Sequence, residues 1–600
     1  MSNPADIHQT VKGGEFLIKE SDPQQIFIPE DFDEETRMIK GMADDFVKTE
    51  VAPNTDAIEA GDFDLSVKLL SKAAELGLVG AHMPEAYGGM GLPANVVTAV
   101  TDSLGPTGSW SVTFAAHTGI GMLPILYFGT EEQKEKYLPR LISAELKASY
   151  CLTEPSSGSD ALAAKTRADL SEDGKYYILN GQKMWITNAG FADLYIVFAQ
   201  VDGDKFTGFI VERESEGLTL GAEEKKLGIK GSSTRQVFFE NVKVPKENLL
   251  GEIGKGHKIA FNALNVGRFK LCVLCVGASK HVIGESIQYA KERIQFGRPI
   301  ADFGAIKYKI SEQIIRIFAS ESAEYRTSND MQQMEELLKA EGASYGDAKL
   351  KAAEEYAIEC ALLKVAGSEA LSYVVDENVQ IHGGMGFSEE GHTARYYRDA
   401  RINRIYEGTN EINRLLAVDM LLKRALKGRI DLIGPAWAVQ KELAAMPSMD
   451  KPEGPYGEEL KAVRDFKKAI LMTAGAAAKL QMEGQLNLEE EQEIIMNVAD
   501  MMLDTFLAES LLLRTMKLAG MEQKPAPQDV YDAMLRVFLH DATARITANG
   551  RSALASFAEG DLLRVMLMGL KRYTKYPPAK VNKLRRLVAD YAIEQGKYPL

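Results

Sequence analysis

A single carboxylate, Glu407, stands in the stretch RIYEGTNEINR, residues 404–414, between an aromatic ring and a glycine–threonine turn. No second acid lies directly beside it, so this stretch does not offer the paired carboxylates of many acid–base sites. What Glu407 can do therefore depends on the groups that other segments bring to it.

Two segments near the middle of the chain suit a flat, negatively charged ligand. SYCLTEPSSGSDA, residues 149–161, is a strand followed by a loop of small residues, whose backbone N–H groups and hydroxyls can face an anion. In NGQKMWITNAG, Trp185 and Thr187 alternate with Ile186 along a strand, so ring and hydroxyl share one face. A planar cofactor fits both segments. The plain alternatives are a well-capped turn and a core tryptophan beside a surface threonine.

Two later segments suit phosphate. RIQFGRPIADFGAIK, residues 293–307, places Arg293 and Arg298 around an aromatic–glycine pair near a helix end, where arginine can contact pyrophosphate with two nitrogens. Alternatively, the two arginines only face solvent at the end of a helix. QIHGGMGF, residues 380–387, is a glycine-rich turn that lets the backbone approach phosphate or ribose. It is not GxGxxG and no strand precedes it, so a Rossmann domain is not predicted.

The spacing of apolar residues predicts the scaffold that holds these segments, a mostly α protein with a central β domain. Apolar residues recur every three or four positions in the first, third and last regions, and every second position in the β region. Proline and glycine would break any helix in the linker. The predicted regions are an N-terminal helical domain (30–146), a central β domain (147–250), a second helical domain (251–427), a linker (428–456) and a helical extension (457–600).

The composition indicates a soluble globular protein with several domains, because 45% of its 600 residues are hydrophobic and 26% are charged. A formal net charge of −15 argues against nucleic-acid binding, which needs clustered positive charge. The eight histidines lack paired-ligand spacing, so no metal site is predicted. No apolar run approaches the length of a membrane span and the N-terminus lacks a signal-peptide pattern, which predicts a cytoplasmic protein.

The four cysteines fit a reducing compartment better than a disulfide framework. Cys272 and Cys275 have the spacing of a redox motif, but they lie in the apolar run FKLCVLCVGA with no strand leading into it. Core packing is therefore the expected use of this pair.

In their order and spacing, the Glu407 motif and the four ligand-binding segments resemble the acyl-CoA dehydrogenase family of flavoproteins. The resemblance covers about residues 30–427, and the helical extension makes the chain most similar to the very-long-chain branch. It implies a helical bundle, a β domain and a second helical bundle, with FAD as cofactor. It also implies oxidation of a fatty acyl-CoA to the trans-2-enoyl-CoA in β-oxidation, with electrons passed to an electron-transferring flavoprotein.

The same resemblance implies that Glu407 is the catalytic base, which removes the substrate's α-proton while a hydride leaves the β-carbon for the flavin. Between Tyr406 and an acyl chain, the carboxylate would lose hydration, and its pKa is expected to rise. Some branches carry the base just before the arginine of NVGR; that position is Gly267 here, so no acid competes with Glu407.

Residues that match the family's binding residues are spread over the whole core. Those matching flavin contacts are Leu152, Thr153, Gly158, Ser159, Trp185, Ile186, Thr187, Arg293, Gln380, Gly383, Gly384, Thr409, Asn410 and Glu411. Those matching substrate contacts are Ser159, Asn265, Arg268, Tyr406 and Gly408, with Arg268 also supporting the Glu407 region. Arg293 and residues 380–384 resemble a grip on the adenosine diphosphate that reaches across from the neighbouring subunit. Relatives with an extension tend to be dimers, so a homodimer is expected.

Several alternatives stay open at this stage. The chemistry could be that of an acyl-CoA oxidase, or the chain could be a non-catalytic flavin-binding assembly protein. Lys307 stands where many relatives have glutamine, and it could contact flavin phosphates or face water. The segment 109–129, rich in small residues such as Ala115 and Gly119, is the expected floor of a deep substrate channel. The basic C-terminal end either docks to anionic membrane or forms a solvated face.

Overall fold

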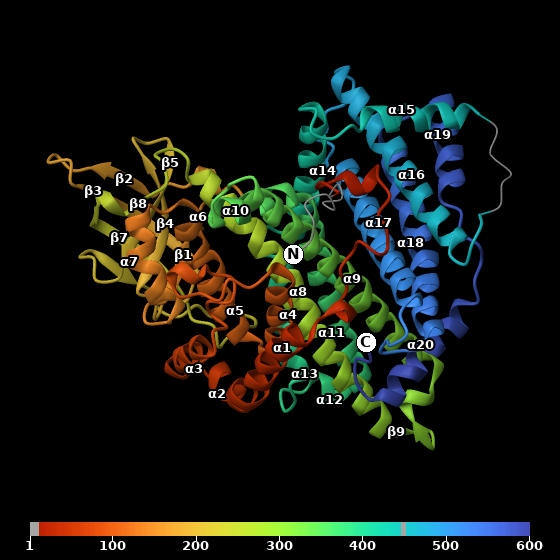
Figure 1. Ribbon diagram of the computed structural model, residues 1–600, viewed down its shortest axis with the longest axis horizontal. Helices are drawn as coiled ribbons and strands as arrows, with labels where there is room; N and C mark the ends of the chain where they lie inside the picture. Colours follow the sequence, from red (N-terminus) through yellow and green to blue (C-terminus); the bar gives the residue numbers. More distant parts are fainter. Residues whose placement is uncertain (1–10, 446–451) are drawn as a thin grey trace.

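The computed structural model describes residues 11–445 and 452–600. Its elements follow the order helices, sheet, helices, and further helices (Figure 1), which confirms the predicted fold class. The first helices are α1 (Glu34–Phe46), α2 (Thr55–Glu59), α3 (Phe63–Glu75), α4 (Ala94–Leu104), α5 (Ser109–Ala115), α6 (Leu123–Phe128) and α7 (Glu131–Ile142). The strands of the β domain are β1 (Ala148–Cys151), β2 (Arg167–Leu170), β3 (Tyr176–Thr187), β4 (Leu194–Val201), β5 (Lys205–Glu212), β6 (Leu218–Leu220), β7 (Thr234–Pro245) and β8 (Leu249–Leu250).

A second set of helices forms the centre of the molecule and leads into the extension. The central elements are α8 (Gly256–Glu292), β9 (Ile294–Gln295), β10 (Arg298–Pro299), α9 (Gly304–Ala340), α10 (Tyr345–Glu355), α11 (Ala357–His382), α12 (Gly384–Phe387), α13 (Thr393–Ala400) and α14 (Asn410–Leu426). The remaining helices are α15 (Ile433–Ala444), α16 (Gly457–Met482), α17 (Gln492–Ala519), α18 (Gln528–Phe557), α19 (Gly560–Tyr573) and α20 (Val581–Gln595).

The β domain is one mixed sheet with the order β6-β7-β3-β2-β4-β5-β8, and β1 pairs with β4. β1 and β2 run parallel to β4, whereas the other pairs are antiparallel. β4 is buried along nearly its whole length, as expected for a central strand. Strand β3 changes register against β7 between Lys183 and Ile186, which is a bulge close to Trp185.

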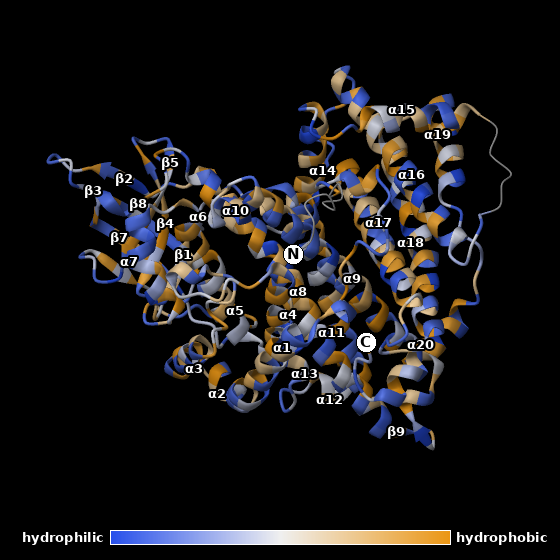
Figure 2. Ribbon diagram, in the orientation of Figure 1, coloured by the Kyte–Doolittle hydropathy of each residue, from blue (hydrophilic) through white to orange (hydrophobic). Residues whose placement is uncertain are grey.

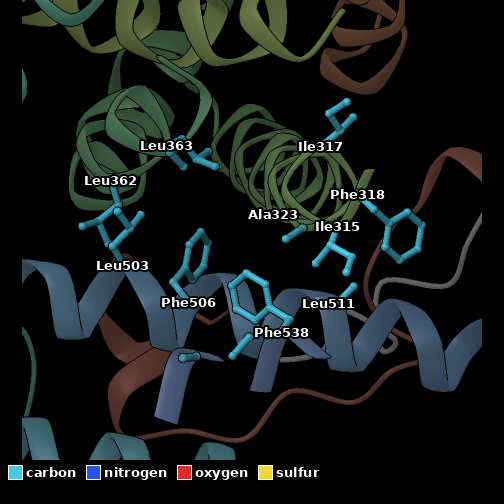
Figure 3. Packing of buried hydrophobic residues seen from close by; sticks show 14 of the residues in the cluster. Ile315, Ile317, Phe318, Ala323, Leu362, Leu363, Leu503, Phe506, Leu511 and Phe538 are labelled. Carbon is cyan, nitrogen blue, oxygen red and sulfur yellow. The ribbon is translucent and has the colours of Figure 1, made fainter. Parts of the chain in front are cut away.

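The extension packs directly on the central bundle and shares its hydrophobic core. In Figure 3, Phe506 of α17 and Phe538 of α18 lie against Ile315 of α9 and Leu362 of α11. The N-terminal segment joins the same core, because the Phe16 ring lies 4.9 Å from that of Phe506. Figure 2 shows hydrophobic residues where α8 meets α4, and polar residues toward solvent. Residues before position 30 were not expected to belong to this core.

Buried ion pairs join the N-terminal segment, the bundle and the extension. Arg514 of α17 is fully buried and pairs with Glu30 and Glu321, each at 2.7 Å. Lys280 of α8 links Glu321 to Asp102 of α4. A buried charge is tolerated only when it is paired, so these contacts require the N-terminal segment, the bundle and the extension to assemble together.

Two predictions about chain segments need correction. The region 428–456 was expected to be a helix-free linker, yet α15 forms within it; Pro435 is its third residue, where no intrahelical N–H bond is needed. Two helical stretches, Ser109–Phe128 and Gly256–Glu292, are long and apolar enough to cross a membrane, although no such run was expected. In each, 72% of the apolar window is buried inside the protein, as in core helices.

In the described part of the chain all four cysteines are buried free thiols, as predicted for core packing.

Candidate active site

Glu407 lies in a tight turn between the short helix Arg401–Arg404 and α14. Its φ is 59° and that of Gly408 is 80°, so two successive residues have left-handed backbone. This conformation is strained for a glutamate and persists only where surrounding contacts hold it. Thr409 ends the turn as the N-cap of α14, its hydroxyl accepting a bond from Ile412 N–H at 3.2 Å.

Three buried side chains hold the carbonyl oxygens of this turn. Arg268 Nε donates to the Glu407 carbonyl at 3.2 Å, and Lys364 Nζ donates to the Gly408 carbonyl at 2.7 Å. The Asn413 amide donates to the Gly408 and Thr409 carbonyls at 2.8 and 2.9 Å. The backbone is thus fixed from α8, α11 and α14 together.

The Glu407 carboxylate itself is left free. Its Oε2 is buried and has no hydrogen-bond partner among residues 11–445 and 452–600. Burial raises the pKa of Glu407 to about 7, against the opposing charges of Arg268 and Lys364. A Cβ at Gly267 would lie only 2.7 Å from Oε2, so the α8 backbone closes one side of the carboxylate. An unpartnered carboxylate with this pKa is suited to taking a proton from a ligand.

Lys364 and Asn413 are site residues that the sequence reading missed. Both are fully buried. Burial lowers the pKa of Lys364 to about 8. The available signal was a lone lysine in the apolar helical run CALLKVAG, which is uncommon unless the charge has partners.

Of the residues predicted after Glu407, Asn410 has a different use. It is 3% exposed; its amide donates to Ser368 and Glu369, each at 3.0 Å, and its Oδ1 accepts from Lys364 at 2.7 Å. The side chain is therefore not open to a flavin, and it anchors the turn. Glu411 is exposed at the start of α14.

An apolar cavity begins beside the base. Tyr406 lines it, with its hydroxyl donating to Asn403 at 2.7 Å. The other walls come from α5, α8, α11, α13 and the residues between α4 and α5, and they include Gly105, Gly108, Ser111, Val112, Leu271, Leu274, Cys275, Ala278, Leu371, Val375 and Tyr396, with His281 and Asp399 as ionisable residues in the lining. Small residues do line this cavity, and Ser111 and Val112 come from the segment 109–129; Ala115 and Gly119 are not among its lining residues, so their place in a substrate channel stays a prediction.

Asn265 and Arg268 lie one turn apart on α8, and Arg268 Nη1 donates to Asn265 Oδ1 at 2.9 Å. Both are buried, at 7% and 5% exposure. Arg268 supports the Glu407 turn as expected, and Asn265 orients the guanidinium.

The loop and the strand that match flavin contacts lie side by side. Met184 N–H donates to the Thr153 carbonyl at 2.9 Å, and Lys183 Nζ donates to the Leu152 carbonyl at 3.2 Å. Lys183 also pairs with Glu154 at 2.7 Å, and both side chains are buried. A buried ion pair thus joins the loop to β3.

These two segments present an open surface. Trp185 is 61% exposed with φ 57°, next to the β3 bulge. Gly158 and Ser159 are exposed, and a Cβ at Gly158 would meet no atom within 4 Å in the described structure. Thr187 is partly exposed, whereas Ile186 packs into the sheet core, so only its backbone can contact a ligand. An exposed ring beside a loop of small residues fits a flat cofactor that carries phosphate.

The base lies near this surface. Burial first, and the Glu407 charge second, raise the pKa of Tyr150, which stands in β1 two residues before Leu152. The Tyr150 hydroxyl donates to the Ala260 carbonyl of α8 at 3.3 Å. β1 and α8 therefore bring Glu407 and the ligand-binding loop to one site.

The residues of the predicted diphosphate grip lie elsewhere in the chain. The ends of α8 and α11 meet through stacked rings of Tyr289 and His382, with centroids 4.1 Å apart. Exposed at this place are Arg293, Gln380, Gly383 and Gly384. Figure 1 shows β9, which follows Arg293, at the opposite end of the molecule from β3, which carries Trp185. A single chain therefore does not bring the residues of the diphosphate grip and the surface around Trp185 to the same ligand.

Lys307 was expected to contact flavin phosphates or to face water, and it does neither. Its Nζ pairs with Asp590 of α20 at 2.5 Å, so it fastens the extension to α9.

Family models match most of the chain. They are described as acyl-CoA dehydrogenase N-terminal domain (residues 33–145), middle domain (149–242) and C-terminal domain (254–422), and a further C-terminal domain model matches 465–572.

Individual proteins agree with these models. A "probable acyl-CoA dehydrogenase" of Bacillus subtilis is 48% identical over 589 residues, 98% of either chain. The human mitochondrial very long-chain specific acyl-CoA dehydrogenase is 40% identical over 425 residues, 69% of this chain and 60% of that protein. The crystal structure of an acyl-CoA dehydrogenase complexed with FAD from Bacillus anthracis has 45% identity and a TM-score of 0.95, covering 98% of this chain and 100% of that one. On this evidence, and with its lone carboxylate set beside an apolar cavity, the protein belongs to the acyl-CoA dehydrogenase family.

Proposed function

We propose that the protein oxidises long-chain fatty acyl-CoA to trans-2-enoyl-CoA as the first step of β-oxidation, with Glu407 as the base. FAD-dependent oxidation of an acyl-CoA is the chemistry of its family, and FAD, when bound, accepts the hydride that leaves the β-carbon. The observation that carries the proposal is the Glu407 carboxylate, whose Oε2 is buried without a hydrogen-bond partner among the described residues and which directly follows Tyr406, a residue that lines an apolar cavity.

Glu407 would take the α-proton of the thioester on its free carboxylate oxygen. The proton is weakly acidic, so the base must be accurately placed, and the three side chains that hold the turn supply this placement. Burial of Oε2 keeps water from this oxygen and raises the pKa of Glu407, which strengthens the carboxylate as a base. The residues that would hold FAD are the loop around Gly158 and Ser159 and the strand that carries Trp185 and Thr187.

The chain-length preference is tested by anaerobic bleaching of the flavin absorbance with acyl-CoA substrates of increasing length, from about four to twenty carbons. The apolar cavity lined by Tyr406 and by residues of α8 and α11 supports a preference for long chains, because each added methylene that enters it leaves water. Bleaching is therefore expected to strengthen with chain length. Equal bleaching by all chains would contradict the long-chain assignment, and a yellow protein that no acyl-CoA reduces would favour the non-catalytic assembly role.

The rate of flavin reduction is expected to rise with pH and to level off above the pKa of Glu407, which is about 7. A base works only when ionised, so the rate at pH 6 should be about tenfold below that at pH 8. Lys364 opposes the rise of this pKa, and Lys364→Met is expected to move the midpoint to higher pH. Stopped-flow reduction across the pH range makes the measurement; a flat profile would rule Glu407 out as the titrating base.

A homodimer is part of the proposal. Around the diphosphate grip the surface is apolar: Phe296 is 93% exposed, Phe387 86%, and Met385 and Ile294 about half exposed. Because β9, next to the grip, and β3, which carries Trp185, lie at opposite ends of the molecule (Figure 1), a partner copy would have to bring the two together. Burial of these rings against that copy would remove them from water.

The proposed electron acceptor is an electron-transferring flavoprotein. An acyl-CoA oxidase would instead react with oxygen directly, so rapid re-oxidation of the reduced protein in air would favour the oxidase.

Membrane contact is proposed for a surface made by α15 and α19, whose C-terminal ends are joined by Arg572 Nη1 donating to the Glu442 carbonyl at 2.9 Å. The apolar side chains exposed on this surface are Ile433, Trp437, Leu562, Val565 and Met568. Not all of the basic C-terminal charge is free, since Arg585 pairs with Glu312 and Asp541. The exposed Trp437 indole and the aliphatic chains, with Lys571 in the last turn of α19, suit an anionic lipid surface.

Met568→Glu is expected to weaken co-sedimentation with vesicles of anionic phospholipid, because a charge on the apolar surface resists burial. Met38→Glu is the matched control, since Met38 of α1 is 69% exposed and Met568 is 68% exposed. Equal binding by both variants and the parent protein would show that this surface does not dock to membrane.

A further inference from the structure

We propose that the extension positions the catalytic turn through Asp500, so that the active site is completed by a residue outside the domains that carry its ligand-binding segments. The inference rests on the base role proposed for Glu407. It assigns Asp500 as a positioning residue, which acts through other side chains and touches neither substrate nor cofactor.

The path begins on α17 and ends at the residue after the base. Asp500 Oδ1 accepts from Arg414 Nε at 2.7 Å. The other two nitrogens of Arg414 donate to both carboxylate oxygens of Glu369 on α11, at 2.8 and 3.1 Å. Glu369 Oε1 accepts from the Asn410 amide at 3.0 Å. All three donor nitrogens of the guanidinium are thereby used within one network.

The last two steps reach the turn itself. Lys364 Nζ donates to Asn410 Oδ1 and to the Gly408 carbonyl, both at 2.7 Å. Asn410 thus connects a cation that holds the turn to a carboxylate that holds Arg414. Since Arg414 lies one turn after Asn410 on α14, its orientation sets the position of Glu369 against Asn410.

Asp500 matters because few other contacts hold the Arg414 side chain in place. The Arg414 side chain is 12% exposed, and its Nε is bonded only by Asp500 among the described residues. Both Arg414 and Asp500 line a cavity between the bundle and the extension. Without the Asp500 carboxylate, Arg414 would have room to turn into that cavity, and Glu369 would lose its fixed two-point contact.

The same helix supplies a matched control. Asp504 lies one turn after Asp500, lines the same cavity and also pairs with an arginine, Arg545, at 2.7 Å. Arg545 belongs to α18 within the extension, so this pair makes no bond to α14 or to the turn. Removing the carboxylate of Asp500 or of Asp504 breaks one ion pair with an arginine at the same cavity. Only the loss of Asp500 disturbs contacts that lead to Glu407.

The test measures proton removal by itself. The full-length protein, with its flavin reduced beforehand so that it cannot accept a hydride, is incubated in D2O with an acyl-CoA, and exchange of the α-proton is followed by mass spectrometry. Asp500→Ala is expected to slow this exchange about tenfold with little change in acyl-CoA affinity, since misplacement of a base acts on the chemical step. Asp500→Glu, which keeps the charge, is expected to restore part of the rate. Asp504→Ala is expected to stay within about twofold of the parent.

Thermal unfolding of each variant accompanies the exchange rates. If Asp500→Ala does not fold, Asp500→Asn replaces it, since the amide keeps the shape and one acceptor oxygen. Equal exchange rates for the Asp500 and Asp504 variants at similar melting temperatures would overturn the inference. If Glu407→Gln exchanges the proton as fast as the parent, the base assignment itself fails; if only Glu407→Gln is slow, the base stands and the role of Asp500 is wrong.

Discussion

Replacing Glu407 with glutamine is expected to slow flavin reduction by acyl-CoA about a thousandfold. A positioned general base contributes roughly a hundredfold to ten thousandfold to rate, and an amide of the same shape cannot accept the proton as a carboxylate does. The structure leaves Oε2 buried without a partner in the described chain, so no neighbouring acid is in contact to take over. Anaerobic stopped-flow reduction by a long-chain acyl-CoA measures the effect.

Stability provides the control for this variant. Burial raises the pKa of Glu407 to about 7, above its value in the unfolded chain, so the ionised carboxylate disfavours the folded state as pH rises through that range. Glutamine removes this penalty. Glu407→Gln is therefore expected to melt at pH 8 at a temperature no lower than the parent protein. A folded Glu407→Gln variant that turns over at the parent rate would end the base assignment.

The sequence predicted the fold well because periodicity is a local signal. Strand β3 and helix α3 both show their apolar pattern within a short window, and the resemblance then ordered the domains. The segment 428–456 was misread because Pro435 was treated as a helix breaker, although in the first turn of α15 it breaks no hydrogen bond. The local sequence there is compatible with a helix, and tertiary packing determines whether the helix forms.

The sequence predicted the site residue that carries the chemistry by itself. It did not predict residues whose role depends on contacts with distant parts of the chain. Glu407 stands in a recognisable motif. Lys364 and Asp500, by contrast, act through partners far away in sequence, and no spacing rule connects them to position 407. Asn410 was predicted to contact the flavin because of its place in the motif. Its side chain is instead occupied by buried hydrogen bonds to Glu369 and Lys364, which the motif does not reveal. Polar networks of this kind are set by tertiary packing.

Gly267→Ala is expected to slow flavin reduction about tenfold to a hundredfold. The added Cβ would lie 2.7 Å from Glu407 Oε2 and 3.0 Å from its Cδ, closer than atoms can remain, so the carboxylate must move. The backbone of the turn is held by Arg268, Lys364 and Asn413, which leaves the side chain to take up the shift. A displacement of the base by a fraction of an ångström to one ångström accounts for a loss of this size.

Gly284→Ala on the same helix separates this effect from a change in α8, since a Cβ there meets no atom within 4 Å in the described structure. Alanine favours a helix interior over glycine by about 1 kcal/mol, so Gly284→Ala should be at least as stable as the parent and fully active. Slow reduction by Gly267→Ala alone, with the pH midpoint of its rate displaced from that of the parent, would place the fault at the carboxylate. Equal activity of the two variants would show that the Glu407 side chain has room the structure does not give it, and that Gly267 is not needed to seat the base.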